Sequence, residues 1–206
     1  MARRSASSGR WRQRQEKDPY VERAAREGWR SRAVFKLAEI DERERLFRRG
    51  MSCVDLGAAP GGWSQYAARR IGRAGQIWAV DLLPMDAIEG VEVIEGDFTR
   101  ADVVAKLRAA LPAGIDLVMS DMAPNLSGTR EIDLPRHMAL ADEALAFADE
   151  ALKPGGDFLL KLFQGEGCDE FVAGVRPRFA KLRLMKPRAS RAESREIYLL
   201  ARQHRM

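Results

Sequence analysis

A series of short apolar runs, separated by stretches of helical periodicity, extends along most of this chain and limits the folds it can adopt. The runs are rich in Val, Ile and Leu and read, in chain order, MSCVDL, QIWAVDL, VEVIEG, IDLVMSD, DFLLKLF, KLRLMK and REIYLLAR. Short runs of this kind are typical of strands that are buried on both faces of a sheet. Because helical stretches separate most of them, we expect right-handed crossovers and a mostly parallel sheet. The pattern predicts a Rossmann-like α/β fold of seven strands with helices on both faces.

Helical patterns occupy most of the intervals between these runs. A helix before the first strand would have Ser31 as its N-cap and Gly50 as its stop. Its buried face would carry Val34, Leu37 and Ile40. Further helices are expected over four later stretches: residues 62–71, 101–110, 134–152 and 169–179. The last two apolar runs are joined by the short basic loop PRASRAES, which permits only antiparallel pairing, so the last strand should run against the rest.

Charge is distributed unevenly along the 206 residues. Residues 1–50 hold 15 Lys+Arg and 8 Asp+Glu, residues 176–206 hold 10 and 2, and residues 51–175 hold 10 and 20. Basic ends around an acidic middle are the pattern expected of a protein that binds a polyanion, although tuning of solubility would produce it too. We expect a basic, flexible arm over residues 1–30, followed by a single domain over residues 31–206.

Cysteine and histidine usage excludes several other classes of protein. Cys53 and Cys168 are far apart, and neither they nor His137 and His204 have the spacing of metal ligands, so we expect neither a disulfide nor a metal site. A reducing, cytoplasmic setting fits best. No stretch is apolar enough to cross a membrane. The Arg- and Ser-rich start MARRSASSGRWRQRQ would also suit an organelle transit peptide.

A glycine-rich segment, VDLGAAPGGW, spans residues 54–63 and joins the first strand to its helix. Glycines there let a ligand approach the backbone, and the helix N-terminus offers free amide donors. The segment matches neither the dinucleotide fingerprint G-x-G-x-x-G nor the P-loop, and Pro60 lacks a donor that a pyrophosphate would use. A dehydrogenase with a nicotinamide cofactor is therefore disfavoured, and a ligand without phosphate is favoured.

Two acids are placed to complete this ligand site. Asp81 ends the second strand, where an acid accepts hydrogen bonds from ribose hydroxyls. Asp97 follows the third strand, where it could receive an adenine amino group. S-adenosylmethionine carries both groups, so we expect it as the cofactor. Each acid would also be explained as a helix cap or a solvated loop residue.

Lys161 is the most unusual residue, because it interrupts the apolar run DFLLKLF within a strand that should be buried. Lysine is rarely buried without a partner, although its stem could also carry the amine to water from the strand end. Asp121 ends its own strand at the same sheet edge, and Glu196 begins the antiparallel strand there. Lys36 lies on the first helix and could reach this place, although an ordinary surface lysine would show the same pattern.

An ordered series of segments along nearly the whole chain is more specific than any single glycine motif. The segments are RSASSGRW, RSRAVFKL, DLGAAPGGWSQY, DLLPMD, SDMAPNLSGT, KPGG, KLFQGEG and SRAESREIY. In this combination the chain resembles the FtsJ-type ribosomal RNA large-subunit ribose 2′-O-methyltransferases of bacteria. The resemblance implies a class I methyltransferase fold that uses S-adenosylmethionine. It also weakens the transit-peptide interpretation, because RSASSGRW belongs to the series.

The resemblance also implies roles for particular residues. The family's Lys-Asp-Lys-Glu catalytic tetrad would fall on Lys36, Asp121, Lys161 and Glu196. Its cofactor contacts would fall on Gly61, Trp63, Asp81, Asp97 and Asp121. Lys161 would then either take the proton of the ribose hydroxyl or orient that hydroxyl towards the methyl group. Lys36 would act on Lys161 as a nearby like charge, and Asp121 and Glu196 would position these groups.

The implied substrate is a uridine of large-subunit ribosomal RNA, presented by the assembled subunit. The basic ends of the chain and the PNLSGT loop would bind this RNA, and we expect a monomer that does not associate with membranes. Two alternatives stay open at this point. The same fold could methylate transfer RNA or another RNA, or the chain could be a non-catalytic RNA-binding assembly factor.

Overall fold

Seven strands pair into one sheet in the order β3-β2-β1-β4-β5-β7-β6. The computed structural model describes residues 18–124 and 127–205. In chain order the strands are β1 (Ser52–Leu56), β2 (Gln76–Asp81), β3 (Val91–Glu95), β4 (Ile115–Ser120), β5 (Leu152–Phe163), β6 (Phe179–Met185) and β7 (Glu196–His204). Each of the seven apolar runs therefore forms a strand, as the sequence predicts.

The direction of the strands also follows the prediction. β1 pairs in parallel with β2 and β4, β2 with β3, and β4 with β5. β7 pairs antiparallel with both β5 and β6, so the expected antiparallel last strand is confirmed. The order reverses between β1 and β4, and in open α/β sheets a ligand binds at the carboxyl ends of the strands beside such a reversal.

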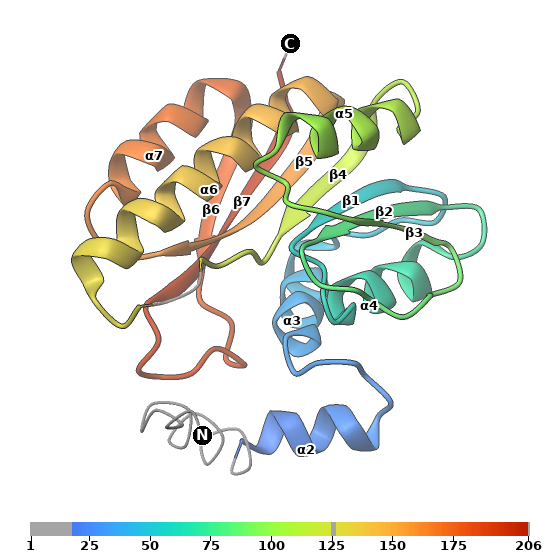
Figure 1. Cartoon of the computed structure of the whole chain (residues 1–206), viewed down its shortest axis with the longest axis horizontal. Helices are drawn as coiled ribbons and strands as arrows, with labels where there is room; N and C mark the ends of the chain where they lie inside the picture. The colour runs from blue at the N-terminus through green and yellow to red at the C-terminus, as the bar shows by residue number, and fades with distance from the viewer. Residues whose placement is uncertain (1–17, 125–126, 206) are drawn as a thin grey trace, which may run out of the picture.

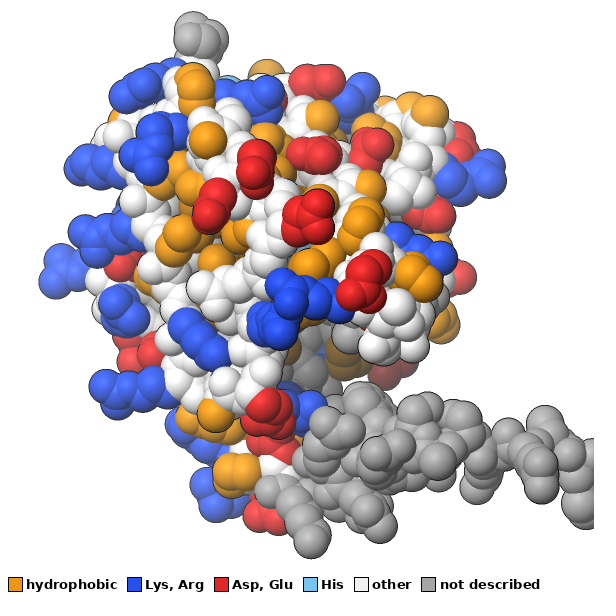
Figure 2. Space-filling model, turned by 90° about the vertical axis from the view of Figure 1, so that its left-hand side faces the viewer, with side chains coloured by type: hydrophobic (Ala, Val, Ile, Leu, Met, Phe, Trp, Pro, Cys, Tyr) orange, Lys and Arg blue, Asp and Glu red, His pale blue; other side chains and the backbone are white. Residues whose placement is uncertain are grey.

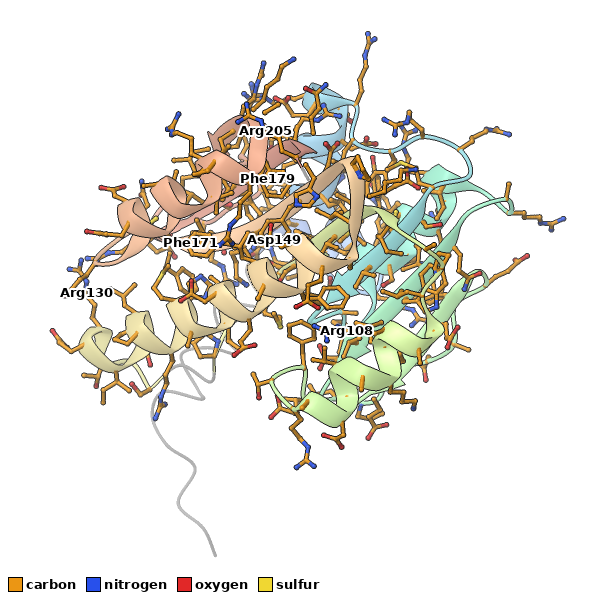
Figure 3. The ribbon with its side chains drawn as sticks, turned by 90° about the horizontal axis from the view of Figure 1, so that it is seen from above. Arg108, Arg130, Asp149, Phe171, Phe179 and Arg205 are labelled. Atoms are coloured by element: carbon orange, nitrogen blue, oxygen red, sulfur yellow. The ribbon has the colours of Figure 1, made fainter. Side chains whose placement is uncertain are left out.

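Helices cover both faces of the sheet (Figure 1). One face carries α3 (Val34–Glu44) and α4 (Gly62–Ile71), whose apolar side chains pack on residues of β1, β2, β4 and β5. The other carries α5 (Ala101–Ala110), α6 (Arg130–Ala151) and α7 (Cys168–Val175). Seen from above, α6 lies between α5 and α7 (Figure 3). Within the described residues, no helix is both long and apolar enough to span a membrane.

The first long helix differs from the expectation at both ends. α3 begins at Val34 rather than beside Ser31, because Val34 N–H donates to the Ser31 carbonyl in a turn and the Ser31 hydroxyl packs against Gly62 instead of capping. The helix ends at Arg45, which adopts a left-handed conformation with φ 50°, five residues before the expected stop at Gly50. The buried positions Val34, Leu37 and Ile40 are as predicted.

The stretch expected as a flexible arm contains a packed helix. Residues 1–17 lie outside the described residues, but α2 (Pro19–Arg26) follows them. The Tyr20 ring packs against Phe35, and Asp18 is buried where it caps the helix and forms ion pairs with Arg32 and Arg191 at 2.6 and 3.2 Å. The structure thus differs from the expected arm over residues 18–30, because α2 has an apolar face and a carboxylate that bind it to the domain.

Candidate active site

Side chains from four elements meet at the carboxyl edge of the sheet. Along a strand, alternate residues face the same side, so Asp121 continues the face of Leu117 and Met119 just after β4 ends. Lys161 pairs with Tyr198 across β5 and β7, and this places both on the same face. Because α3 packs on that face, its lysine, Lys36, lies opposite them.

Two ion pairs join the residues of the expected tetrad. Lys36 Nζ lies 2.7 Å from Glu196 Oε1, and Lys161 Nζ lies 3.1 Å from Asp121 Oδ1. Lys161 Nζ also donates a hydrogen bond to the Asp121 carbonyl oxygen. The Lys161 side chain is only 8% exposed, so its amine sits at the base of the site rather than reaching into open solvent. The structure therefore brings all four side chains of the tetrad together.

Tyr198 connects the two ion pairs. Its hydroxyl donates to Asp121 Oδ1 at 2.8 Å, and Lys36 Nζ lies 5.8 Å from the centre of its ring. Burial, and then the negative charges of Asp121 and Glu196, raise the pKa of Tyr198 well above its ordinary value, so the phenol stays protonated and remains a donor.

Asp121 stays ionised although it is deeply placed. Burial acts to raise its pKa, but the charges of Lys161 and Lys36 and the hydrogen bonds from Tyr198 and Lys161 outweigh burial, and the pKa lies below its ordinary value. The site therefore presents a fixed negative charge held between two ammonium groups, and such a charge favours a cationic ligand centre.

A cavity of about 370 Å³ adjoins this cluster at the carboxyl ends of β1, β2, β3 and β4. Its lining includes Asp81, Asp97 and Asp121, together with Gly57 and Leu140. Gly57 has φ 77°, and a Cβ there would lie 2.4 Å from Met122 Cγ, so only glycine fits the first turn of the loop.

Asp81 and Asp97 are each fixed by backbone amides. Asp81 accepts from Ala59 N through Oδ2 and from Leu83 N through Oδ1, at 2.9 and 2.8 Å. Asp97 Oδ1 accepts from both the amide and the hydroxyl of Thr99, which lower its pKa and keep it charged. Because a carboxylate oxygen can accept more than one hydrogen bond, both acids retain acceptor capacity towards the cavity.

Gly61 and Trp63 lie at the start of α4. Gly61 is the N-cap of α4 with φ 102°, and Arg30 and Met85 lie so near that a Cβ would be 2.7 Å from the Met85 sulfur. Trp63 is 3% exposed, and its Nε1 donates to the Ala33 carbonyl at 3.0 Å. Neither is among the residues that line the cavity. Their contact with the cofactor stays a prediction.

Two titratable residues beside the site were missed by the sequence reasoning. Asp55, the fourth residue of β1, is 1% exposed and accepts from Ser64 Oγ at 2.6 Å; its position inside an apolar run was the available signal. His137 is 1% exposed against the Phe163 ring, and burial together with the Lys161 charge lowers its pKa to about 4. Nothing in the spacing of His137 indicated this neighbourhood.

Comparison with known proteins agrees with this geometry. Residues 29–204 match a sequence model described as FtsJ-like methyltransferase. A protein of Alkalilimnicola ehrlichii named Ribosomal RNA large subunit methyltransferase E is 54% identical over 201 residues, covering 97% of this chain and 96% of the relative. A protein of the same name from Hydrogenovibrio crunogenus is 50% identical over 200 residues, covering 97% of each.

Solved structures share the fold. A Plasmodium falciparum protein assigned as a ribosomal RNA methyltransferase superposes with a TM-score of 0.78 at 26% identity, over 85% of this chain and 98% of that one. Human methyltransferase-like protein 13, solved in complex with SAH, superposes with a TM-score of 0.60 at 18% identity, over 82% and 81%, and is similar in fold alone. From the match over residues 29–204 and the two bacterial relatives, this chain is a methyltransferase that belongs to the FtsJ-like family.

Proposed function

We propose that this methyltransferase uses S-adenosylmethionine to methylate the ribose 2′-hydroxyl of a uridine in large-subunit ribosomal RNA. The observation that carries the proposal is the meeting of Lys36, Asp121, Lys161 and Glu196 beside the cavity that ends β1 to β4. The names of the two bacterial relatives, which are at least half identical to this chain, support the substrate.

The cavity fits such a cofactor by its size and by its set of acceptors. Its volume of about 370 Å³ suits a small organic ligand. Asp81 would accept from ribose hydroxyls, Asp97 from the adenine amino group, and Asp121 would lie towards the cationic end. When bound, the cofactor supplies a methyl group already activated by a sulfonium. Gly61 and Trp63 would complete the binding site through their backbone at the start of α4.

Lys161 is the residue placed to act on the ribose hydroxyl. An ammonium group has three N–H donors, and the Asp121 carbonyl and carboxylate take up two of them, so one direction is left for the incoming oxygen. Asp121 holds the amine in place, while the Lys36–Glu196 pair at 2.7 Å forms the opposite wall of the acceptor site. The reaction then depends mainly on alignment of the oxygen with the methyl carbon.

Single-turnover methylation tests the role of Lys161. Lys161→Ala should lower the rate by about 10²–10⁴-fold, the usual contribution of a positioned acid–base group. If the rate rises with pH in the wild type but not in Lys161→Arg, the Lys161 amine removes the proton. If the pH–rate profiles of the two proteins are parallel, Lys161 orients the hydroxyl instead. A near-normal rate in Lys161→Ala would contradict both roles.

The substrate is tested separately. Ribose methylation in large-subunit RNA, mapped by mass spectrometry with and without the gene, should differ at one uridine. Purified large subunits, protein-free ribosomal RNA and transfer RNA, each assayed with labelled cofactor, distinguish the proposal from a transfer-RNA enzyme. A Lys161→Ala protein that restored ribosome assembly without methylating RNA would favour an assembly factor.

RNA would reach the site across basic side chains near the two ends of the chain. Exposed arginines include Arg26 on α2, and Arg188 and Arg195 in the loop between β6 and β7. Asp18, at the start of α2, forms an ion pair with Arg191 of this loop and so holds α2 beside it. Residues 125–126 of the PNLSGT loop lie outside the described residues. All four residues of the tetrad come from one chain, so a monomer would suffice for catalysis.

A further inference from the structure

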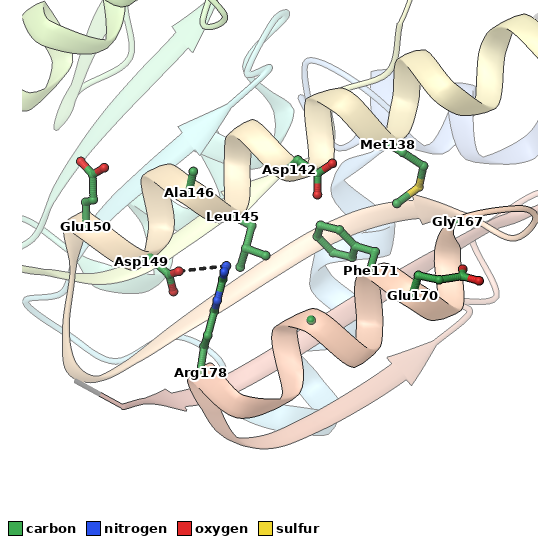
Figure 4. Close-up of a pocket in the computed structure, with 11 residues that line it drawn as sticks. Met138, Asp142, Leu145, Ala146, Asp149, Glu150, Gly167, Glu170, Phe171 and Arg178 are labelled. Atoms are coloured by element: carbon green, nitrogen blue, oxygen red, sulfur yellow. Dashed lines mark ion pairs between the residues drawn. The ribbon is translucent and has the colours of Figure 1, made fainter.

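A groove of about 760 Å³ runs between α6 and α7 on the outer surface of the helical layer. Its floor is apolar and includes Leu145 and Phe171, whose side chains lie between the two helices (Figure 4). Ala146 and Gly174 are exposed along it, and a Cβ added to Gly174 would meet no atom within 4 Å. The groove is therefore open to a side chain from another molecule.

The rim of this groove is acidic in a chain whose net charge is +5. Asp142 and Glu170 project from the two helices on either side of Phe171 (Figure 4). Within residues 18–124 and 127–205, neither of them forms an ion pair, whereas Asp149 pairs with Arg178 at 2.9 Å. No Lys or Arg occurs in residues 137–151 or 164–175.

This charge distribution decides the class of partner. Phosphates would be repelled by the rim, so RNA is disfavoured as the occupant. Red acidic side chains gather in the upper middle of one face of the molecule, and most blue basic ones lie towards its left side and top, with a blue group near the centre (Figure 2). An apolar floor with an acidic rim complements a cationic polypeptide segment that carries an apolar side chain.

We propose that the α6–α7 groove docks a Lys/Arg-rich protein segment on the surface of the large ribosomal subunit. The proposal rests on the proposed function, because the assembled subunit offers such segments next to the RNA. α6 begins at Arg130, after the loop that follows Asp121, and the groove extends along the helix to Asp149. A segment held there would orient the catalytic edge towards the RNA.

Filling the groove provides the test. Gly174→Arg places a bulky cation over Phe171, whereas Gly174→Ala leaves the groove open and serves as the matched control. Gly174→Arg should raise KM for salt-washed large subunits about tenfold, with kcat and the KM for protein-free ribosomal RNA unchanged. Added positive charge would otherwise strengthen binding to RNA, so a selective rise in KM can come only from a lost protein contact.

Charge reversal of the rim is a second, independent variant. Asp142→Lys combined with Glu170→Lys should act as Gly174→Arg does, whereas Glu89→Lys, an exposed acid at the other end of the sheet, should not. Wild-type kinetics for both groove variants on subunits would overturn the proposal. So would a photo-crosslinker at Ala146 that reacts with ribosomal RNA rather than with a ribosomal protein.

A peptide-binding assay tests the groove independently of the methylation reaction. A labelled oligolysine peptide with a central leucine pair should bind the wild type and Gly174→Ala, and binding should be lost in Gly174→Arg. Absence of binding to the wild type would overturn the groove proposal even if methylation were normal. Absence of methylation on every RNA, with peptide binding intact, would instead overturn the proposed function.

Discussion

Asp55 is a buried carboxyl whose ionised form the fold disfavours. It is buried within β1, and burial, with the added repulsion of Asp121 and Asp81, raises its pKa to about 7 although Ser64 donates to it. In the unfolded chain its pKa would lie near the ordinary value of 3.8. Above about pH 4 the unfolded state gives up this proton while the folded state keeps it, so the free energy of unfolding falls as pH rises to about 7.

Replacing this carboxyl with an amide should remove that pH dependence. The penalty of the wild type at pH 8 is about 4 kcal/mol, from about three pKa units. Asp55→Asn should therefore be more stable relative to the wild type at pH 8 than at pH 4.5, as measured by urea unfolding. Asp102→Asn, which changes an exposed acid on α5, serves as the control and should not show this gain. Equal differences at both pH values would contradict the prediction.

Most of the site could be predicted at the level of residues because its signals are local. Lys161 and Asp121 lie at or near the ends of parallel strands, and Glu196 at the start of an antiparallel one, so topology alone brings them to one edge. Tyr198 follows Glu196 by two residues and shares its face, so the same rule could have found it. His137 reaches the site only through the way α6 packs on β5, which no local pattern encodes.

At the level of elements, the end of α3 shows where the sequence was misleading. The sequence predicts that this helix ends at Gly50, but it ends at Arg45. Arg45 is exposed and adopts φ 50°, a left-handed conformation that a residue other than glycine adopts only with some strain. Arg45→Gly should relieve this strain and raise the free energy of unfolding by about 0.5–1 kcal/mol. Arg43→Gly, the same change inside the helix, should lower it by about 1 kcal/mol. Urea unfolding checks both, and a loss in Arg45→Gly would be the contrary result.

A buried carboxylate, Asp18, strengthens the attachment of α2 to the domain. Asp18 is 8% exposed and pairs with Arg32 and Arg191, whose side chains are 14% and 29% exposed. Asp18→Ala should lower the free energy of unfolding by about 3 kcal/mol, because two partly buried cations lose their partner. Glu27→Ala removes the exposed Arg23 pair and should have a much smaller effect, because exposed ion pairs contribute little to stability. Faster amide hydrogen exchange in α2 of Asp18→Ala would locate the change, and unchanged exchange would count against it.

At the level of the whole molecule, the basic charge lies near the two ends of the chain and the acidic charge on the α6–α7 side. The sequence shows that charge is unevenly distributed along the chain. It does not show which surface of the molecule carries each charge, because that depends on which helices face outward. Arg188 and Arg195 lie close to Glu196 in the chain, whereas residues 137–151 and 164–175 contain no Lys or Arg, and Arg178, which also lines the groove, is paired with Asp149. Opposite charges on separate surfaces allow one enzyme to contact RNA and protein at once.

The first 17 residues should contribute to RNA affinity without contributing to the chemistry. They contain six Lys+Arg and one acid, whereas all four residues of the tetrad lie between residues 36 and 196. Each phosphate contact that is lost reduces the slope of log affinity against log salt by about 0.7–0.9. A chain of residues 18–206 should therefore bind ribosomal RNA more weakly, with a slope shallower by at least about 1, while its kcat at saturating RNA equals that of the full chain. Fluorescence binding over a salt series measures the slope. An identical slope in both chains would mean that these cations do not touch phosphate, and a fall in kcat would mean that the segment also positions the acceptor.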